Sequence, residues 1–311
     1  MSNPIVARLR VAPAVAAALA DRRPVVALES TLISHGLPYP QNLEVARASE
    51  AAVREGGAEP ATVAIRDGQV LVGLSDADLE ALATAPLGSV RKAARPSLAA
   101  ALAAGGWAAT TVSATMIAAH AAGIRVFATG GIGGVHRGAL GGAAPSFDIS
   151  SDLEELGRTP MAVVCAGPKA ILDVPATLEY LETHGVPVLT IGQDTVPGFY
   201  ARSSGIASAQ VAPDVDRAAE ICRMQLELGL GGILVCVPVP AAEALRDDVA
   251  RNAIEQAISE AHGADVQGPA TTPWLLARIA ELTNGASIRA NTALIVNDAR
   301  VAGQLAVLLG T

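Results

Sequence analysis

Lysine is almost absent from this chain. Lysine and arginine together number 22 among 311 residues, and only Lys92 and Lys169 are lysines. Arginine can replace lysine at a solvated surface, but its guanidinium stays protonated and cannot act as an amine nucleophile. Where lysine persists, amine chemistry becomes plausible, although a drift toward arginine could also leave two lysines by chance.

Cysteine and positive charge are also scarce. The three cysteines, Cys165, Cys222 and Cys236, are odd in number and show no CxxC spacing, which argues against a disulfide framework or a zinc knuckle. The net charge is −8 and the pI is near 5.2, so a general attraction to nucleic acid or to an anionic membrane is not expected. These features favour a reducing, cytoplasmic setting.

Long hydrophobic runs are missing as well. No run approaches the roughly 18 apolar residues that cross a bilayer. Residues 11–20, VAPAVAAALA, superficially resemble the apolar part of a signal peptide, but Pro13 interrupts them and they fit a short amphipathic helix. Hydrophobic residues make up 51% of the chain and charged residues 17%, which is enough apolar material to bury a large core.

Short apolar runs of strand length alternate with helical patterns. The runs that predict buried strands are residues 25–28, 61–65, 124–129, 161–166, 186–191 and 232–237. The patterns that predict helices are residues 42–55, 76–82, 113–122, 178–183, 241–261, 272–285 and 291–309. Ser75, with Asp78 three residues on, marks one helix start. This alternation predicts an α/β layer architecture in a single domain, residues 1–311.

Lys169 and Glu29 both follow apolar runs. Lys169 stands in AGPK directly after MAVVCA, where a strand end meets the next element and where α/β proteins usually place their sites. Glu29 ends the run VVAL, a position that suits acid–base work, though a turn or capping residue could stand there too. Lys92 has Arg91 and Arg95 nearby, and such cations favour a neutral amine and also suit a phosphate. The residues alone do not decide which lysine plays which part.

A glycine-rich segment, ATGGIGGVHRG at residues 128–138, places four glycines before His136 and Arg137. Such a loop can bring backbone N–H groups, an imidazole and a guanidinium to a phosphate. It matches neither the dinucleotide-binding fingerprint nor the P-loop. A purely structural glycine turn is the alternative.

Asp148 and Asp152 lie four residues apart in SFDISSD, with Ser150 and Ser151 between them. Oxygen groups of this kind suit Mg²⁺ or Mn²⁺, which keep several waters and accept one or two carboxylates. The plainer interpretation is a helix cap, in which Ser151 or Asp152 begins a helix through residues 153–156.

Five longer motifs occur in order: VVALESTLISHGLPYPQN, ATTVSATMIAAHAAGIRVFATGGIGGVHRG, FDISSDL, VVCAGPKAILD and TLEYLETHGVPV. Together they make the chain strongly resemble the pseudouridine-5′-phosphate glycosidase family, also called the indigoidine synthase A family, from about residue 8 to 309. The resemblance implies a three-layer α/β/α fold with a mixed, largely buried sheet, a homotrimer, and a divalent metal, Mn²⁺ by preference. It also implies reversible conversion of pseudouridine 5′-phosphate and water to uracil and ribose 5-phosphate.

The resemblance also implies roles for individual residues. Lys169 matches the Schiff-base nucleophile, Glu29 the proton donor and Asp148 the metal ligand. The residues that match substrate-binding positions are Lys92, Val112, Thr129, His136, Ser150, Ser151, Asp152 and Asn291. The connection at residues 139–146 is longer than the family pattern, which could alter a loop beside the phosphate or the metal.

Two other functions stay open at this point. One is a Schiff-base aldolase or lyase that acts on a different sugar phosphate with the same Lys169 and Glu29. The other is a sugar-phosphate-binding protein without catalysis, in which Lys169 is only a positive charge. Under the family's reaction, a separate kinase is the expected partner in the pathway, because no kinase domain is attached to this chain.

Overall fold

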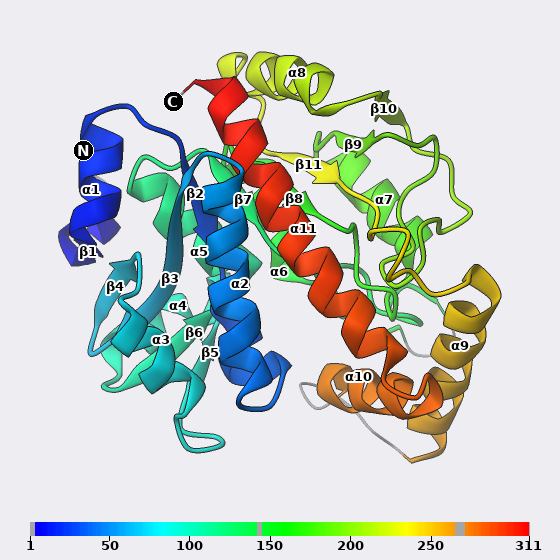
Figure 1. Cartoon of the computed structure of the whole chain (residues 1–311). Helices are drawn as coiled ribbons and strands as arrows, with labels where there is room; N and C mark the ends of the chain where they lie inside the picture. Colours follow the sequence, from blue (N-terminus) through cyan, green and yellow to red (C-terminus); the bar gives the residue numbers. More distant parts are fainter. Residues whose placement is uncertain (1–3, 142–144, 265–270, 311) are drawn as a thin grey trace.

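The computed structural model describes residues 4–141, 145–264 and 271–310. Within them the chain forms one mixed β-sheet with helices on both faces (Figure 1). The strands are β1 (Leu9–Val11), β2 (Val25–Leu28), β3 (Glu59–Arg66), β4 (Gln69–Val72), β5 (Arg91–Ala93), β6 (Trp107–Thr110), β7 (Val126–Ala128), β8 (Ala162–Cys165), β9 (Val188–Ile191), β10 (Gln210–Ala212) and β11 (Ile233–Cys236). Their order is β1-β4-β3-β2-β7-β8-β11-β9-β10, and β6 pairs with both β3 and β5. The pairs β3–β4 and β3–β6 are antiparallel, and the other pairs are parallel.

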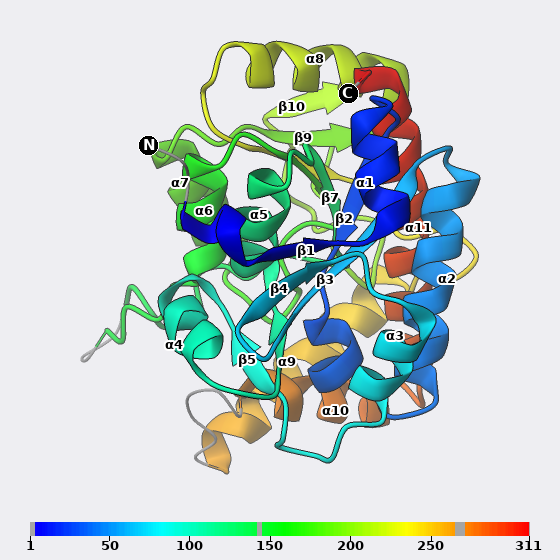
Figure 2. The same ribbon diagram turned by 90° about the vertical axis from the view of Figure 1, so that its left-hand side faces the viewer.

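Two helical layers enclose the sheet (Figure 2). One face packs against α1 (Pro13–Ala20), α5 (Val112–Ala121), α6 (Ser151–Arg158) and α7 (Val174–Thr183). The other face packs against α2 (Gln41–Glu55), α8 (Val215–Glu227) and α11 (Ala286–Leu309). The remaining α-helices described are α3 (Asp76–Ala83), α4 (Leu98–Ala103), α9 (Asp247–Gly263) and α10 (Thr271–Leu282). The three-layer α/β/α fold with a mixed sheet is therefore confirmed.

Strand β2 shows why the apolar runs are continuous. Val25 and Ala27 belong to the core beneath α1 and α5, whereas Val26 and Leu28 belong to the core beneath α2 and α11. Successive side chains of a strand point to opposite faces, so a strand covered on both faces needs apolar residues throughout. All four residues are buried.

The predicted strands and helices are present, with shifted ends in several cases. Helices α4 and α8 were not predicted, and the predicted helix with the largest shift is the one expected from residue 241, because α9 begins only at Asp247. Before it, Leu245 donates its N–H to the carbonyl oxygen of Tyr200, so the chain pairs with a distant loop there. Ser75 and Asp78 form the expected capping box at the start of α3. The strands that the sequence did not predict, β1, β4, β5, β6 and β10, are short.

Helix α11 is long and apolar enough, by length and composition alone, to cross a membrane. The short apolar runs of the sequence did not predict such a helix. Half of the most apolar window of α11 is buried within the protein, and Leu294, Ala302 and Leu305 are fully buried. The helix packs along α2, α8 and the sheet, as a core helix of an α/β layer does.

Three neighbouring parallel strands, β2, β7 and β8, end side by side. The residues that follow them therefore meet at one edge of the sheet, where α/β folds usually bind ligands. Helices α9 and α10 pack near this edge, together with the residues that follow β8 and the N-terminal half of α11.

Candidate active site

A cavity of about 320 Å³ lies at this edge of the sheet. Five of the predicted site residues line it: Glu29, Lys92, Thr129, Lys169 and Asn291. Its remaining lining is largely apolar, with side chains of Leu32, Phe199, Leu276 and Ile295 among them. The cavity thus combines lysine and glutamate side chains with a largely apolar lining, which is typical of a small-molecule site.

Glu29 follows directly after β2, and hydrogen bonds of its neighbours fix its position. Ser30 accepts the N–H of Thr110 at 2.9 Å, and Thr31 donates its hydroxyl to the carbonyl oxygen of the same residue at 2.7 Å. The Glu29 carboxylate itself accepts a short hydrogen bond from the Thr129 hydroxyl. Glu29 thereby reaches the residues that follow β7.

Burial raises the pKa of Glu29 above its ordinary value. The positive charge of Lys169 and the hydrogen bond from Thr129 act in the opposite direction but do not cancel this effect. A raised pKa keeps more of the carboxyl protonated near neutral pH, which is the form a proton donor needs.

Lys169 stands on a tight turn after β8. Gly167 has φ +88°, a left-handed conformation that favours glycine. The N–H of Lys169 donates to the carbonyl oxygen of Ile132 at 3.1 Å, and the N–H of Ile132 donates to the carbonyl oxygen of Gly167 at 3.2 Å. These bonds join the lysine turn to the glycine-rich loop, so the backbone of Lys169 is held firmly.

Lys92 reaches the cavity from β5. This strand pairs with β6, where Lys92 lies opposite Ala109. Burial lowers the pKa of Lys92, and the charge of Lys169 lowers it further. The two lysines of the chain therefore lie in one cavity and influence each other electrostatically, which makes a chance distribution of lysine a poor explanation.

Several lining residues were not among the predicted site residues. His35 lies at the cavity, and burial followed by the charge of Lys92 lowers its pKa. Leu276 and Phe199 come from α10 and from the loop after β9. Ile295 could have been found, because it lies four residues after Asn291 and so shares its helix face.

A second group of predicted residues lies outside the cavity lining, at the N-termini of α5 and α6. Asp152 is buried and accepts hydrogen bonds from the backbone N–H groups of Ser113 and Gly133, both at 3.0 Å. The hydroxyl groups of Ser113 and Ser151 are 3.2 Å apart. Asp152 thus joins two helix starts to the glycine-rich loop, and its charge acts on both Glu29 and Lys92.

The helix cap in this segment is Ser150, whose hydroxyl accepts the N–H of Asp152 at 3.2 Å. The segment does begin a helix, but the assignment of the cap to Ser151 or Asp152 was wrong, because these are the first two residues of α6. Val112, the first residue of α5, is 2% exposed, so its side chain belongs to the core. Arg95, expected beside a phosphate, forms a short ion pair with Glu155.

Asp148 and His136 lie apart from the cavity lining. The Asp148 carboxylate is largely exposed, and one of its oxygens is 3.8 Å from Nδ1 of His136. Among the described residues, no group of three or more histidine, cysteine, aspartate or glutamate side chains is suitably arranged for a metal ion. One exposed carboxylate fits a divalent cation that keeps most of its water ligands, and does not fit a dehydrated, multi-ligand site. Residues 142–144 of the long connection at 139–146 lie outside the described residues.

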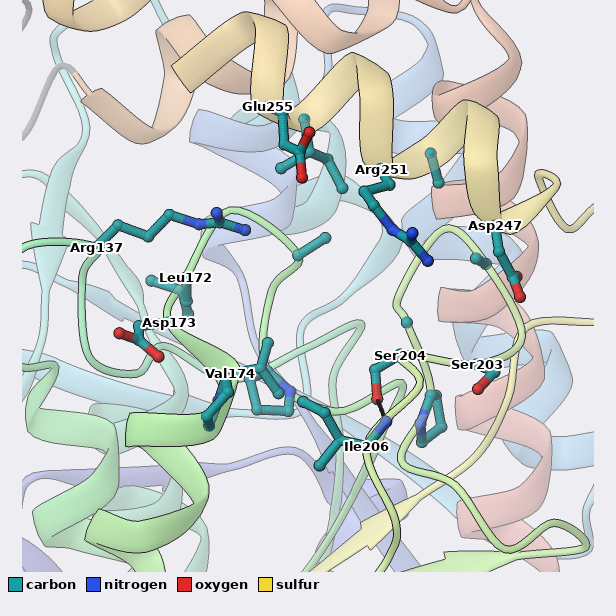
Figure 3. A pocket seen from close by; sticks show the side chains of 18 residues that line it. Arg137, Leu172, Asp173, Val174, Ser203, Ser204, Ile206, Asp247, Arg251 and Glu255 are labelled. Carbon is teal, nitrogen blue, oxygen red and sulfur yellow. Dashed lines mark hydrogen bonds between the residues drawn. The ribbon is translucent and has the colours of Figure 1, made fainter. Parts of the chain in front are cut away.

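A larger cavity, of about 570 Å³, lies on the other side of the lysine turn and is lined by Pro168 and Ala170 (Figure 3). Arg137 and Arg251 point into it from the glycine-rich loop and from α9. Three carboxylates, those of Asp173, Asp247 and Glu255, also line it. None of the predicted catalytic groups does, so the smaller cavity is the better candidate active site.

The fold and the smaller cavity define a class: an α/β protein in which two lysines and a carboxylic acid line one cavity near the ends of parallel strands. The family model of indigoidine synthase A like proteins matches residues 14–308. The chain therefore belongs to this family.

Relatives with assigned names cover almost the whole chain. A pseudouridine-5′-phosphate glycosidase of Paracoccus denitrificans is 54% identical over 97% of this chain and 99% of its own length. One of Caldanaerobacter subterraneus is 53% identical, over 95% and 94%. The crystal structure of the prealnumycin C-glycosynthase in complex with ribulose 5-phosphate has a TM-score of 0.88 and 38% identity, with 97% of each chain covered. An indigoidine synthase A-like protein of Thermotoga maritima has a TM-score of 0.82 and 34% identity, over 93% and 94%.

Proposed function

We propose that the protein is a pseudouridine-5′-phosphate glycosidase, an enzyme that cleaves the carbon–carbon glycosidic bond to give uracil and ribose 5-phosphate. The observation that carries this proposal is the meeting of Lys169, Lys92 and Glu29 in one cavity. The names of relatives above 50% identity support the same reaction.

A lysine nucleophile explains how a carbon leaving group can depart. Glycosidases that use two carboxylates protonate a heteroatom of the leaving group, and pseudouridine offers carbon instead. The Lys169 amine attacks C1′ of the ribose, the bond to the ring oxygen breaks, and Glu29 gives that oxygen a proton. The attached nitrogen gives up a proton, its lone pair then forms the imine as the bond to uracil breaks, and the uracil carbon takes up a proton. Water hydrolyses the imine to ribose 5-phosphate and the free amine.

Lys169 is the proposed nucleophile, and Lys92 the proposed substrate-binding cation. Lys169 stands on a turn that is held by backbone hydrogen bonds, and its charge acts on Glu29 more strongly than that of Lys92 does. Lys92 has the lowered pKa, so it is the alternative nucleophile. Comparison of Lys169→Arg with Lys92→Arg separates the two, because arginine keeps the charge and cannot form an imine.

The N-termini of α5 and α6 are the proposed phosphate site. Unpaired N–H groups at a helix N-terminus bind anions, and the helix dipole adds to the attraction. Val112 and Ser151 begin these helices, and the hydroxyl of Ser150 and the nearby ammonium of Lys92 can add contacts. Thr129 and Asn291 in the cavity, and His136 near Asp148, are the other proposed substrate contacts.

Asp148 is the proposed ligand of a hydrated divalent metal, Mn²⁺ by preference. The hydrated ion would supply positive charge and ordered water beside the substrate or its loop. Asp148→Ala is expected to lose steady-state activity while the lysine adduct still forms at the normal rate. Loss of the adduct as well would contradict this part.

The proposed assembly is a homotrimer in the cytoplasm, and a separate kinase is the proposed source of the phosphorylated substrate.

The alternative activity is a Schiff-base lyase for another sugar phosphate, because the prealnumycin C-glycosynthase was crystallised with ribulose 5-phosphate. Screening of pseudouridine 5′-phosphate against other sugar phosphates as substrates distinguishes the two activities.

The test measures, by chromatography, the uracil that is released from pseudouridine 5′-phosphate in the presence of Mn²⁺. Wild-type protein is expected to release uracil, Lys169→Arg to release none, and Lys92→Arg to release it with a raised KM. Activity retained in Lys169→Arg would contradict the assignment of the nucleophile. No release by wild-type protein with metal bound would contradict the proposed substrate.

A further inference from the structure

Arg95 joins the three elements that make up the proposed phosphate site. It lies three residues after Lys92, at the start of the short 3₁₀-helix that follows β5. Its backbone N–H donates to the hydroxyl of Ser113, in the first turn of α5, at 3.1 Å. Its guanidinium donates a short hydrogen bond to the carboxylate of Glu155, in α6. One residue thus connects the strand that carries Lys92 with both helices.

The partner of Arg95 is a buried carboxylate. The side chain of Glu155 is only 2% exposed, and its second oxygen accepts a short hydrogen bond from the hydroxyl of Thr159, which follows α6. Burial of a carboxylate is costly unless it is paired and hydrogen-bonded, and a buried ion pair adds little stability compared with apolar residues of similar size. This pair therefore calls for an explanation other than stability, and its geometry offers one.

Further hydrogen bonds extend the connection to the helix starts and to the strand. The hydroxyl groups of Ser113 and Ser151 are 3.2 Å apart, and the N–H of Ser113 donates to the carboxylate of Asp152 at 3.0 Å. On the other side, the hydroxyl of Ser97 donates to the carbonyl oxygen of Lys92 at 3.3 Å. The backbone of Lys92 and the first turns of α5 and α6 are thus held in one hydrogen-bonded unit.

We propose that Arg95 and Glu155 are positioning residues, whose ion pair holds Lys92 and the N-termini of α5 and α6 at the spacing that binds the 5′-phosphate of the substrate. Neither side chain is among the described residues that line the smaller cavity, so the pair acts through the groups that it joins. A site that is already ordered loses less free energy when the sugar phosphate binds. The inference rests on the proposed function, because it deepens the proposed phosphate site.

A direct contact of Arg95 with the phosphate is the competing arrangement. The Arg95 side chain is 36% exposed, and a guanidinium binds phosphate well. In that arrangement Glu155 competes with the phosphate for the guanidinium, so loss of its charge would strengthen binding of the sugar phosphate. In the proposed arrangement the same loss weakens binding. The sign of the effect of Glu155→Gln therefore distinguishes the two.

Borohydride trapping of ribose 5-phosphate on the protein separates binding from chemistry. The half-saturating concentration of ribose 5-phosphate measures binding, and the trapping rate at saturation measures imine formation. Glu155→Gln is expected to raise the half-saturating concentration at least about tenfold and to leave the rate at saturation within about threefold. Arg95→Met should act in the same direction. The double variant should bind no more weakly than Arg95→Met alone, because both substitutions break one interaction.

Ribose without a phosphate group is the control for the ligand. Its trapping rate is expected to be equal in Glu155→Gln and in wild-type protein, because the positioned groups bind the phosphate. Glu55→Gln is the control for the substitution. Glu55 pairs with Arg300 at 3.0 Å between α2 and α11, and neither is among the described residues that line the two cavities. Glu55→Gln should leave both trapping parameters unchanged.

An unchanged half-saturating concentration in Glu155→Gln would overturn the inference, and a lowered one would favour direct contact of Arg95 with the phosphate. An equal loss of trapping with ribose would also overturn it, since the effect would then not depend on the phosphate. If Arg95→Met fails to fold because Glu155 is left unpaired, Glu155→Gln stays decisive, since it leaves no buried charge without a partner. Absence of any adduct in wild-type protein would instead contradict the proposed function.

Discussion

At the scale of single residues, Glu29 shows how the fold changes an ordinary side chain. The sequence places this glutamate after a buried strand, but its partner Thr129 lies 100 residues later, just after β7. The shift in its pKa depends on burial and on Lys169 and Thr129, which only the folded chain brings together. A sequence pattern can therefore nominate Glu29 and cannot supply its protonation behaviour.

The first prediction concerns the pH dependence that Glu29 confers. A proton donor works only while protonated, so activity falls as pH rises through its pKa, and burial moves this fall to a higher pH than for an ordinary glutamate. Glu29→Gln should lower kcat about 10²- to 10⁴-fold and remove this part of the profile. The measurement is kcat between about pH 5 and about pH 9. An unchanged profile in the glutamine variant would assign the titration to another group.

The second prediction concerns Asp148, whose carboxylate is largely exposed. Chelation of divalent metal should abolish turnover in wild-type protein, and added Mn²⁺ should restore it. Asp148→Asn should need a higher Mn²⁺ concentration for the same rate, since a neutral amide binds a hard cation less well than a carboxylate. If the rate of Asp148→Asn depended on Mn²⁺ concentration as the rate of wild-type protein does, the metal would bind elsewhere.

At the scale of elements, the strands that are apolar almost throughout were predictable, and short strands that include charged or polar residues were not. Strands β2 and β8 are apolar throughout because helices cover both faces. Strand β5 contains Arg91 and Lys92 in only three residues, and it exists because β6 lies beside it. This pairing is a contact between distant elements, so no local pattern predicts it, and the presence of Lys92 in the same cavity as Lys169 could not be predicted.

The third prediction concerns the crossing of α2 and α11, which covers one face of the sheet. A Cβ atom at Gly303 would lie 2.6 Å from the carbonyl oxygen of Val53 and 2.9 Å from the Cα atom of Gly56. Gly303→Ala should therefore reduce the free energy of unfolding by about 1–3 kcal/mol, despite the better helix propensity of alanine.

The control for this crossing is Gly263→Ala, because a Cβ atom there would meet nothing within 4 Å. This variant should be as stable as wild-type protein or slightly more stable. Denaturant unfolding of the two variants checks the pair. Equal stability of the two variants would mean that α2 and α11 can move apart at Gly303 without a loss in the free energy of unfolding.

At the scale of the whole molecule, the active site is assembled from distant parts of the sequence. The cavity takes residues from the ends of β2, β7 and β8, and from β5, α10 and α11. The family motifs identify Lys169, Glu29 and Thr129, because each motif contains a strand end. The apolar wall of Phe199 and Leu276 lies in segments without such a motif, so only the fold reveals it.

The fourth prediction concerns assembly and cooperativity. Sedimentation equilibrium should give about three times the 31.3 kDa mass of one chain. Because the layers share one sheet, denaturation should follow a single transition by fluorescence and by circular dichroism. A monomer mass would contradict the homotrimer, and two separate transitions would contradict a single domain.

The most direct test of the proposed mechanism is to find the residue that carries the sugar. Wild-type protein is incubated with ribose 5-phosphate and borohydride, digested, and mapped by mass spectrometry. The mechanism predicts one reduced adduct, on Lys169, which persists in Lys92→Arg and disappears in Lys169→Arg. An adduct on Lys92, or release of uracil by a protein that never forms an adduct, would contradict it.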